Sequence, residues 1–417
     1  MSRLAELIEQ LCPDGVEYRP LGEIADLQRG SGMPKKLFVD EGIPAIHYGH
    51  IFTKYGIHTK CAAAYLAPED ADKLTRVYPG DLVVANTSEN LEDVGKGVVW
   101  LGEAEGVTGG HATVVRSKTV DSVFLSYFLR TENFALKKRK YSQGTKVVEL
   151  SAANLSKIDI PVPPVEVQRE IVRILDQFTT LEAELEAELE ARRAQYEHYR
   201  NHLLSYESLA ARGPVEMVKL GDIATRVVTG VTPQASNSRY YQNGSNPWIR
   251  TQDVNFNRIS AASEFVTDNA IDDLPLKWVK ANSIIVAISG ASAGRSAILG
   301  IDAVTNQHCC NLEINSNHAD YRYVYYSLAA RYAELRGLGR GARGDLNVSI
   351  IKSFEIPVPS MAEQGRIADL LDRFDALVND ITSGLPAEIA ARRAQYEHYR
   401  DRLLSFPEKV VYGSDAS

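Results

Sequence analysis

One ten-residue segment occurs twice in this chain, and this repetition constrains the fold more than any other feature of the sequence. The letters ARRAQYEHYR fill residues 191–200 and again residues 391–400 of the 417-residue chain. Ten identical residues do not recur by chance, and a repeat of fixed period divides a long chain into copies of one structural unit. We therefore predict two copies of a unit that is about half the protein.

The repeat extends in both directions from this segment. The letters IPVP occur at 160–163 and at 356–359, and LGEIA at 21–25 is answered by LGDIA at 220–224. Further matched pairs are Gln168 with Gln364, Leu175 with Leu371, and Phe178 with Phe374. Both copies have the same order, so the chain is predicted to read globular, helix, globular, helix.

The size and composition of the chain fit this plan. A protein of 46.1 kDa with 44% hydrophobic residues exceeds one ordinary core, so about two to four domains are expected. No run of about 18 apolar residues is present, and the amino-terminal segment mixes charged residues with leucine at helical spacing. We therefore expect a soluble, cytoplasmic protein with no membrane partner.

The cysteines do not indicate a metal site or a disulfide framework. The chain has four of them, and none forms a CxxC pair. They are Cys12, Cys61, Cys309 and Cys310. Buried thiols are the favoured interpretation.

The first helical part, predicted at 161–210, carries an amphipathic stripe. From Glu166 onward, apolar and aromatic residues recur mostly at steps of three and four, which is the period of one helix face. Within the stripe, the tetrads LEAE, LEAE and LEAR begin at Leu181, Leu185 and Leu189 and consist of strong helix formers. The pattern predicts a long, coiled-coil-like helix.

The second helical part, predicted at 357–408, repeats the stripe but not the tetrads. The letters SGLP at 383–386 stand in their place, and a proline inside a helix ends or kinks it. Because proline is well accommodated at a first helical position, a new helix is expected to begin near Pro386.

The connectivity suggests how these helical parts pair. Antiparallel pairing within the chain buries both stripes, and an internal partner has a high effective concentration. The alternative is that each helix pairs with another chain. We predict an α+β fold in which mixed α/β domains at 1–160 and 211–356 are separated by a pair of long antiparallel coiled-coil helices, related by a pseudo-twofold repeat and followed by a tail at 409–417.

Both globular parts contain short apolar runs between turn residues. Runs such as 80–86 and 282–289 predict strands. A helix is expected before each long helix, around 123–140 and 321–335. Outside the shared framework the two parts match poorly, and similar scaffolds with dissimilar loops favour binding of two dissimilar targets.

Motifs of catalysis are hard to find. The chain has no GxxxxGK[ST] or HExxH sequence. The letters NPW at 246–248 match the Asn-Pro-Pro-aromatic motif of amino methyltransferases only in part, and a turn explains them. His47 and His50 lack a third metal ligand at suitable spacing, which favours surface histidines. We do not expect an enzyme.

The charge of the chain is acidic overall but locally basic. A net charge of −8 argues against a protein that coats nucleic acid through bulk positive potential. Basic clusters nevertheless occur in both globular parts, at 137–140 with Lys146, and at Arg336, Arg340 and Arg343. These clusters lie at nearly equivalent positions of the repeat.

Taken together, the motifs resemble the specificity subunit of type I restriction-modification systems. The motifs that carry the resemblance are the double IPVP, the LEAE tetrads, the double RRAQYEHYR, LGDIA at 220–224, TGVTP at 229–233, WIRTQD at 248–253 and SGASAG at 289–294. The resemblance covers nearly the whole chain, and the order and duplication of its motifs make it specific.

The resemblance implies a non-catalytic DNA reader. In that family each globular part is a target recognition domain for one half of a bipartite, asymmetric sequence in double-stranded DNA, and the helices set the gap between the halves. Two methyltransferase subunits dock on the helices and use S-adenosylmethionine, and restriction or translocase subunits add ATP- and Mg-dependent chemistry. No cofactor or metal is then expected in this chain.

Two groups of residues are predicted to contact DNA. Basic side chains contact phosphate, and the candidates are Lys137, Lys138, Arg139, Lys140, Lys146, Arg340 and Arg343. Polar loop residues read base edges, and the candidates are Lys35, Lys36, His50, Thr232, Gln234, Arg239, Arg250 and Gln252. The alternatives are a solvated surface for the basic clusters, a turn for Thr232, and for Arg250 a strand residue paired with a carboxylate.

Two functions of other classes stay open. A protein adaptor built on a coiled-coil pair explains the helices and the acidic charge but gives the basic clusters no role. A self-sufficient methyltransferase predicts that the isolated chain binds S-adenosylmethionine.

Overall fold

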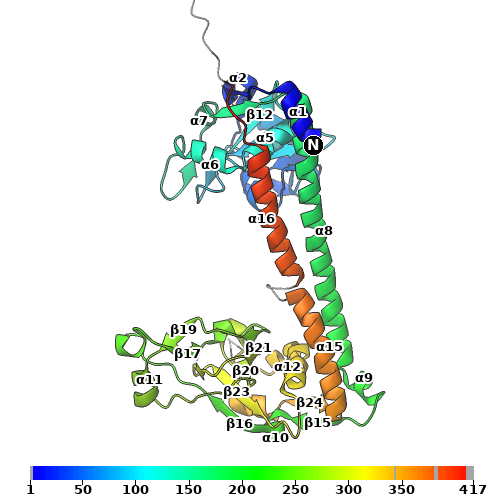
Figure 1. Ribbon diagram of the computed structural model, residues 1–417, viewed down its shortest axis with the longest axis vertical. Coiled ribbons are helices and arrows are strands. Elements are labelled where there is room, and N and C mark those ends of the chain that lie inside the picture. The colour runs from blue at the N-terminus through cyan, green and yellow to red at the C-terminus, as the bar shows by residue number, and fades with distance from the viewer. Residues whose placement is uncertain (1–2, 342–343, 380–383, 410–417) are drawn as a thin grey trace, which may run out of the picture. The chain divides into compact units, whose positions relative to one another are not determined.

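The computed structural model describes the chain except for its two ends and two internal segments (Figure 1). The described residues are 3–341, 344–379 and 384–409. Contacts between residues divide the chain into two units. Unit 1 comprises Met1–Leu185 and Ile389–Ser417, and unit 2 comprises Glu186–Glu388.

Unit 1 is built around a mixed five-stranded sheet. In sheet order, its strands are β2 (Ala25–Arg29), β12 (Ala112–Ser117), β8 (Leu82–Ala85), β10 (Gly97–Trp100) and β5 (His58–Thr59). Neighbouring strands are antiparallel except β10 and β5. Every residue of β8 and β10 is buried, as expected of apolar runs covered on both faces. The strand predicted at 80–86 is confirmed.

Unit 1 contains a second five-stranded sheet and two strand pairs. The sheet has the order β3 (Phe38–Val39), β6 (Tyr65–Leu66), β4 (Ile43–Ile46), β11 (Gly106–Thr108) and β7 (Thr75–Val77). The pairs are β1 (Glu17–Pro20) with β14 (Asp159–Val162), and β9 (Thr87–Ser88) with β13 (Val148–Glu149). Of these contacts, only β4 with β11 is a parallel pair.

Short helices complete the globular part of unit 1. They are α1 (Arg3–Leu11), α2 (Leu21–Ile24), η1 (Lys35–Leu37), α3 (Tyr48–Thr53), α4 (Pro68–Ala71), α5 (Ser122–Phe128), α6 (Glu132–Arg139) and α7 (Ala152–Leu155). The helix expected around 123–140 is thus two helices. Thr131 explains the interruption, because its side chain accepts a hydrogen bond from the Phe134 backbone and caps a new helix at α6.

Unit 2 repeats the central sheet of unit 1. Its strands are β16 (Ala224–Thr229), β23 (Cys309–Ile314), β20 (Ile284–Ala287), β21 (Ser296–Leu299) and β18 (Arg258–Ile259). The last pair alone is parallel, as in unit 1. The strand predicted at 282–289 is β20, and the shared strand order and directions confirm the internal repeat.

The second sheet of unit 2 is smaller. It has the order β19 (Glu264–Val266), β17 (Asn246–Ile249) and β22 (Val304–Thr305), which corresponds to β6, β4 and β11 of unit 1. Among the described residues of unit 2, no strand corresponds to β3, and the pairing of β7 with β11 is reduced to an isolated antiparallel bridge between Val279 and Ala303. A further pair, β15 (Glu216–Lys219) with β24 (Glu355–Val358), matches β1 with β14.

The short helices of unit 2 occur in a similar order. They are α9 (Tyr206–Ala210), α10 (Leu220–Ile223), η2 (Ser238–Tyr240), η3 (Thr251–Asp253), α11 (Asp268–Asp273), η4 (Gly290–Ser292), α12 (Tyr321–Ala330), α13 (Tyr332–Gly337) and α14 (Val348–Ser353). The helix expected around 321–335 is again two helices, α12 and α13.

Three long helices form the helical parts. They are α8 (Val165–Leu203), α15 (Met361–Asn379) and α16 (Leu385–Leu403). Helix α8 is continuous over 39 residues, and the division between the two units falls inside it. Helix α16 begins one residue before Pro386. Ser383, the first residue of the predicted interruption, lies outside the described residues.

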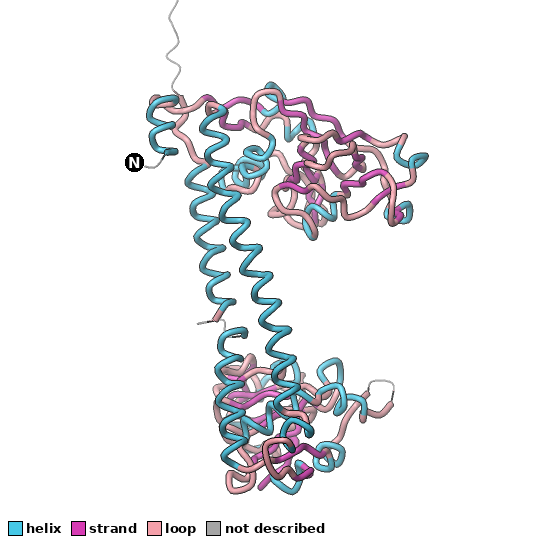
Figure 2. The backbone as a smooth tube through the Cα atoms, turned by 90° about the vertical axis from the view of Figure 1, so that its right-hand side faces the viewer, coloured by secondary structure: helices cyan, strands magenta, loops and turns pink. Residues whose placement is uncertain are grey.

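In unit 1 the first half of α8 pairs with α16 in antiparallel fashion, and Figure 2 shows the two helices side by side. The ring of Phe178 lies 5.7 Å from that of Tyr399 and 6.4 Å from that of Tyr396. One turn further along α8, Glu182 forms an ion pair with Arg393, which precedes both tyrosines. Residue numbers rise along one helix as they fall along the other.

In unit 2 the second half of α8 makes the matching contact with α15. The ring of Tyr199 lies 6.4 Å from the ring of Phe374, which is the repeat equivalent of Phe178. Tyrosines of α8 and α16 thus pack against a phenylalanine of the paired helix in each unit. Two positions of the predicted stripe, Leu181 and Tyr199, have exposed side chains.

A buried glutamine joins each globular part to its long helix. In unit 1, the side chain of Gln168 accepts a hydrogen bond from Asp121 N at 2.6 Å and donates one to Pro163 O at 2.7 Å. In unit 2, Gln364 makes the same two bonds, both at 2.9 Å, with Asp320 N and Pro359 O. The IPVP segment and the glutamine that follows it therefore form the same hydrogen-bonded connection in both units.

The cysteines agree with the prediction with one exception. Cys12, Cys309 and Cys310 are buried, whereas Cys61 is exposed, so the expectation of a buried thiol was wrong for Cys61. Burial raises the pKa of the Cys310 thiol to about 12. Within the described part of the chain, no helix is both long enough and apolar enough to cross a membrane.

Candidate nucleic-acid interface

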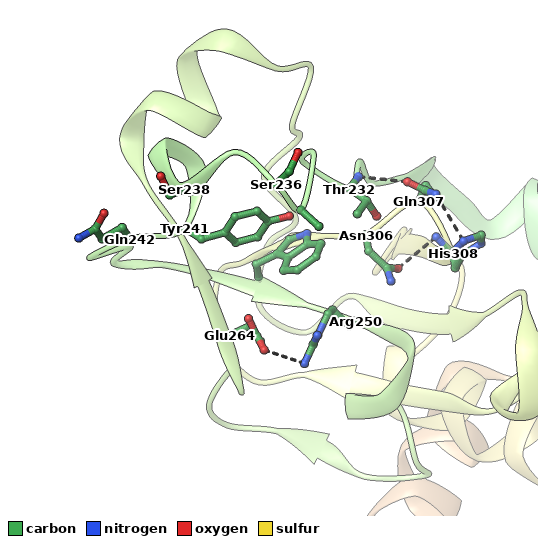
Figure 3. Close-up of a pocket in the computed structure, with 12 residues that line it drawn as sticks. Thr232, Ser236, Ser238, Tyr241, Gln242, Arg250, Glu264, Asn306, Gln307 and His308 are labelled. Carbon is green, nitrogen blue, oxygen red and sulfur yellow. Dashed lines mark hydrogen bonds and ion pairs between the residues drawn. The ribbon is translucent and has the colours of Figure 1, made fainter.

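A pocket of 860 Å³ opens on unit 2 beside β17, β19 and β22 (Figure 3). It is lined by Thr232, Ala235, Ser236, Ser238, Tyr241, Gln242, Trp248, Arg250, Glu264, Asn306, Gln307 and His308. Trp248 and Tyr241 form an aromatic wall, with ring centroids 5.9 Å apart. Their polar atoms bond to the backbone of the TGVTP segment, at Val231 O and Pro233 O. The donor groups of both aromatic side chains are therefore already used within the chain.

Arg250 and Glu264 form an ion pair in this pocket (Figure 3). Their closest nitrogen and oxygen atoms are 3.0 Å apart. Arg250 directly follows β17 and Glu264 begins β19, and the antiparallel register of these strands brings the two side chains together. The Arg250 guanidinium also lies 5.8 Å from the Trp248 ring centroid. The structure thus shows Arg250 paired with a carboxylate.

The loop after β22 supplies two amides and an imidazole. Gln307 accepts a hydrogen bond from the backbone nitrogen of Thr232 at 3.2 Å, and Asn306 accepts one from His308 N at 3.1 Å. The side chain of Gln307 also lies 3.4 Å from His308 Nε2. These contacts tie the predicted residue Thr232 to the loop 306–308 (Figure 3).

The other predicted base-reading residues of unit 2 do not line this pocket. Gln234 and Gln252 are exposed. Arg239 forms an ion pair with Asp273 at 3.5 Å and donates a hydrogen bond to Asn269. The structure brings together Thr232 and Arg250 of the five predicted residues and leaves the other three outside the pocket.

Unit 1 places different chemistry at the equivalent position. The parallel pairing of Ile46 with Thr108 in unit 1 corresponds to the pairing of Ile249 with Thr305 in unit 2. His47, the residue after Ile46, is therefore the counterpart of Arg250. An uncharged imidazole in unit 1 takes the place of a guanidinium in unit 2.

The histidines of unit 1 belong to an aromatic cluster. The ring of His47 lies 5.6 Å from Phe38 and 5.4 Å from His50, and Tyr48 lies 4.9 Å from His111. Burial, followed by the nearby His50, Lys35 and His111, lowers the pKa of His47 to about 4. Burial also lowers the pKa of His50.

His50, predicted to read bases, thus lies inside this cluster, and its Nδ1 atom is buried without a hydrogen-bond partner in the described part of the chain. Lys35 and Lys36, also predicted, are exposed on η1. Among the described residues, no group of three or more His, Cys, Asp or Glu side chains is arranged to hold a metal ion.

One lysine of the basic cluster in unit 1 does not reach solvent. Lys138 is 2% exposed, and its ammonium group donates to Glu92 O at 2.9 Å and to Val94 O at 2.7 Å. Burial lowers the pKa of Lys138 to about 8. The prediction that Lys138 contacts phosphate was wrong, because α6 turns this side chain inward.

The other described residues of the basic clusters are exposed or half-buried. Lys137 is half-buried, donates to Asp159 O at 2.9 Å and lies 4.5 Å above the Tyr18 ring. Arg139, Lys140 and Lys146 are exposed. In unit 2, Arg340 is exposed, whereas Arg343 lies outside the described residues.

One segment matches a nucleophile motif by its letters. Residues 290–294 read GASAG, which fits GxSxG. In serine hydrolases that motif places the serine on a sharp turn from a strand into a helix, next to a histidine base. Here Ser292 ends the short helix η4, and no hydrogen bond joins Ser292 to a histidine among the described residues. The segment gives no support to hydrolase chemistry.

Sequence reasoning missed most of the residues that line the pocket. Trp248 and Arg250 belong to the WIRTQD motif, so the motif itself was a usable signal. The letters NQH at 306–308 come directly after a buried strand, and polar residues in that place are typical of a binding loop. Glu264 gave no signal, because its partner is 14 residues away in the sequence and only strand pairing brings them together.

Comparison with known sequences identifies one family. The family described as "Type I restriction modification DNA specificity domain" matches twice, at residues 13–191 and 213–391. The two matches correspond to the two copies of the repeat and together cover most of the chain.

Individual relatives agree. A type I restriction enzyme specificity subunit of Escherichia coli is 36% identical over 270 residues, which cover 62% of this chain and 65% of that protein. A putative type I restriction enzyme specificity subunit of Haemophilus influenzae is 27% identical over 413 residues, covering 94% of this chain and 96% of that protein.

Solved structures share the fold. A chain from a study of type I restriction-modification system assembly matches with a TM-score of 0.68 at 15% identity, covering 94% of this chain and 98% of that chain. The S subunit of a type I system from M. genitalium matches with a TM-score of 0.54 at 15% identity, covering 94% and 96%.

Proposed function

Because the chain belongs to the family of type I restriction-modification specificity subunits, we propose that it reads a bipartite DNA target, with one half-site for each unit. The observation that carries this proposal is the pair of equivalent positions after β4 and β17. One scaffold, present twice, carries His47 within an aromatic cluster in unit 1 and Arg250 within a polar pocket in unit 2. A common frame with unlike side chains suits two unlike half-sites.

The side chains of unit 2 have the chemistry that base reading requires. Arginine donates to guanine, asparagine and glutamine pair with adenine, and a carboxylate accepts from cytosine. Unit 2 offers all of these groups in one pocket. Exposed cations such as Arg139, Lys140 and Arg340 suit phosphate contacts, which supply affinity and register but carry no sequence information.

The chain itself is proposed to be non-catalytic. Methylation of adenine would come from two methyltransferase subunits that bind S-adenosylmethionine, and ATP- and Mg-dependent translocation or cleavage from further subunits. The helix pairs of each unit leave Tyr199 and Tyr399 partly exposed, and these amphipathic surfaces are the proposed docking sites. In this proposal the chain needs no cofactor of its own.

Sequencing of methylated adenines in a host, with and without this gene, tests the function. The expected result is one bipartite motif that is methylated only when the gene is present. Methylation that is unchanged by removal of the gene would contradict the proposal.

Two measurements separate the other function classes. Fluorescence anisotropy with duplex DNA and the partner methyltransferase distinguishes a DNA reader from a protein adaptor, since an adaptor would give no sequence-dependent signal. Calorimetry of the purified chain with S-adenosylmethionine addresses a self-sufficient methyltransferase, for which binding by the isolated chain is required.

A further inference from the structure

The wall of the pocket in unit 2 presents two opposite charges side by side, Arg250 and Glu264 (Figure 3). We propose that this pair reads the major-groove edge of one G·C base pair, with Arg250 donating to guanine and Glu264 accepting from cytosine. This inference rests on the proposed function, because it requires that unit 2 present its pocket to a duplex. It adds the identity of one base pair and the two side chains that select it.

The chemistry of the pair matches a G·C edge in one orientation. In the major groove, guanine presents the acceptors N7 and O6, and the adjacent cytosine presents the amino group N4 as a donor. Arginine carries only donors and an ionised glutamate only acceptors. With the two charged groups 3.0 Å apart, donors face the guanine acceptors while the carboxylate faces the cytosine amino group.

The same pair disfavours the other base pairs. An A·T pair keeps the N7 acceptor but places the adenine amino donor where guanine has O6, and it places the thymine O4 acceptor towards the carboxylate, so one arginine contact and the glutamate contact become repulsive or unpaired. Reversing G·C to C·G exchanges donor and acceptor in the same way. Discrimination through a repulsive element of this kind is a common route to specificity.

The backbone around the pair holds both residues in place. Arg250 N donates to Asp253 Oδ2 at 2.9 Å, and the other oxygen of Asp253 accepts from Ser263 Oγ at 2.7 Å. Ser263 directly precedes Glu264. Arg250, directly after β17, and Glu264, at the start of β19, are therefore held near each other through a shared aspartate, and a preorganised site loses less freedom on binding.

A role in stability alone does not explain the pair. The side chains of Arg250 and Glu264 are 27% and 42% exposed, and ion pairs with this degree of exposure contribute little to stability. Because Glu264 compensates the charge of Arg250, the pair offers phosphate no net positive charge. A base edge that satisfies both side chains fits this arrangement better than a phosphate does.

Unit 1 carries no matching pair at the equivalent position. His47 occupies the place of Arg250, and its lowered pKa keeps it uncharged at neutral pH. The G·C contact is therefore assigned to the half-site of unit 2.

Selection from a pool of duplexes tests this assignment. The full chain, in complex with the methyltransferase subunits of its own system, is incubated with duplexes whose two half-sites are randomised, and the bound fraction is sequenced. Arg250→Gln is expected to relax or change one G·C position in one half-site and to lower the affinity for the original target about 5- to 150-fold. The other half-site should keep its sequence.

A second variant and a matched control keep the result interpretable. Glu264→Gln removes the negative charge but keeps an acceptor, so it should reduce discrimination at that same position and keep guanine preferred. The double variant Arg226→Gln with Glu313→Gln removes another ion pair of unit 2 that lies outside the pocket. Every base preference should survive in this control.

The possible outcomes separate this inference from the function on which it rests. If the unmodified complex selects no sequence, the proposed function fails. If it selects two half-sites but Arg250→Gln changes no base preference, or weakens all duplexes equally as a lost phosphate contact would, the G·C assignment is overturned. Should Arg250→Gln fail to fold, Glu264→Gln decides alone, and unchanged preferences at every position overturn the assignment.

Discussion

The two units use the same central sheet, with five strands in the same order and the same directions, but they differ in the residue that follows the equivalent strands β4 and β17 of their second sheets. After β4, unit 1 continues with His47 in a cluster of rings. After β17, unit 2 continues with Arg250 in an ion pair. The second sheet of each unit determines where the side chain after β4 or β17 lies. The residue type at that position determines which groups it presents.

The units agree again where each joins its long helix. The phenol of Tyr127 donates to Asp176 at 2.6 Å, and the phenol of Tyr326 donates to Asp372 at 2.6 Å. Gln168 and Gln364 make the same pair of backbone contacts. The comparison shows that the contacts between each globular part and its long helix are the same in both units, while the residues after β4 and β17 differ.

Changing the length of α8, the helix that the two units share, is expected to have the largest effect on methylation of the DNA target. Deleting residues 185–188 removes about 6 Å of α8 and rotates the remainder of the helix by about 40°. If α8 acts as a ruler, the gap in the DNA target shortens, methylation at the original target is lost, and both half-site sequences stay the same. Methylome sequencing measures all three results.

Inserting a further LEAE tetrad at the same place is the matched control for the deletion, and it should lengthen the gap. A methylated motif with an unaltered gap in either variant would contradict the hypothesis that the length of α8 sets the gap between the half-sites.

Removing the shared glutamine should destabilise each unit separately. Gln168→Ala or Gln364→Ala leaves a buried backbone donor and acceptor without partners, at a cost of about 2–4 kcal/mol in the unit concerned. Hydrogen exchange, measured peptide by peptide, reports the loss in one unit while the other serves as reference. Gln195→Ala, at an exposed position of α8, should leave hydrogen exchange unchanged in both units. If a single variant lowered protection from hydrogen exchange equally in both units, the units would unfold together and the prediction would be contradicted.

Acid should destabilise unit 1 more than unit 2. The unfolded chain binds a proton on His47 below about pH 6.5, whereas the buried side chain in the folded protein does so only near pH 4. Stability therefore falls as pH falls through this window, by up to about 3 kcal/mol, and is unaffected by His47 above it. Hydrogen exchange between pH 7.5 and pH 4.5 should show the difference between units, and His47→Gln should reduce it. A difference that persists in this variant would assign the effect to other groups.

The smallest effect is expected from the exposed cations. Arg139→Ala with Lys140→Ala should weaken DNA binding evenly across sequences and reduce the slope of log affinity against log salt by about 2. Lys138→Met, in the same helix, should leave that slope unchanged, because Lys138 is buried against backbone carbonyls. A changed slope in Lys138→Met would contradict the buried position of Lys138. An unchanged slope in the double variant would show that Arg139 and Lys140 do not contact phosphate.

Several elements of the fold were predictable because their signals are local. The strands β8 and β20 are continuous apolar runs, and the helix start at Leu385 is explained by Pro386. Other features depend on partners distant in sequence. Lys138 belongs to a basic run and looks like its neighbours, yet the rotation of α6 buries it. Leu181 fits the apolar period of α8 but is exposed.

The candidate site shows the same division. Thr232 and Arg250 were predicted, since polar residues in the TGVTP and WIRTQD motifs are visible as letters. Glu264, Asn306 and Gln307 were not, because they come from separate strands and loops that only the sheet brings to one pocket. The sequence of one chain does not indicate which of its loops lie next to each other in the folded protein.

By itself, the sequence determined the duplication, the order of globular and helical parts, and the family, since these depend on letters and their spacing along the chain. Only the tertiary structure decided which side chains share a pocket, which lysine of a basic run is buried, and that a histidine of one unit stands where an arginine stands in the other. Those facts arise from strand register and helix rotation, which are set by the packing of residues far apart in the sequence.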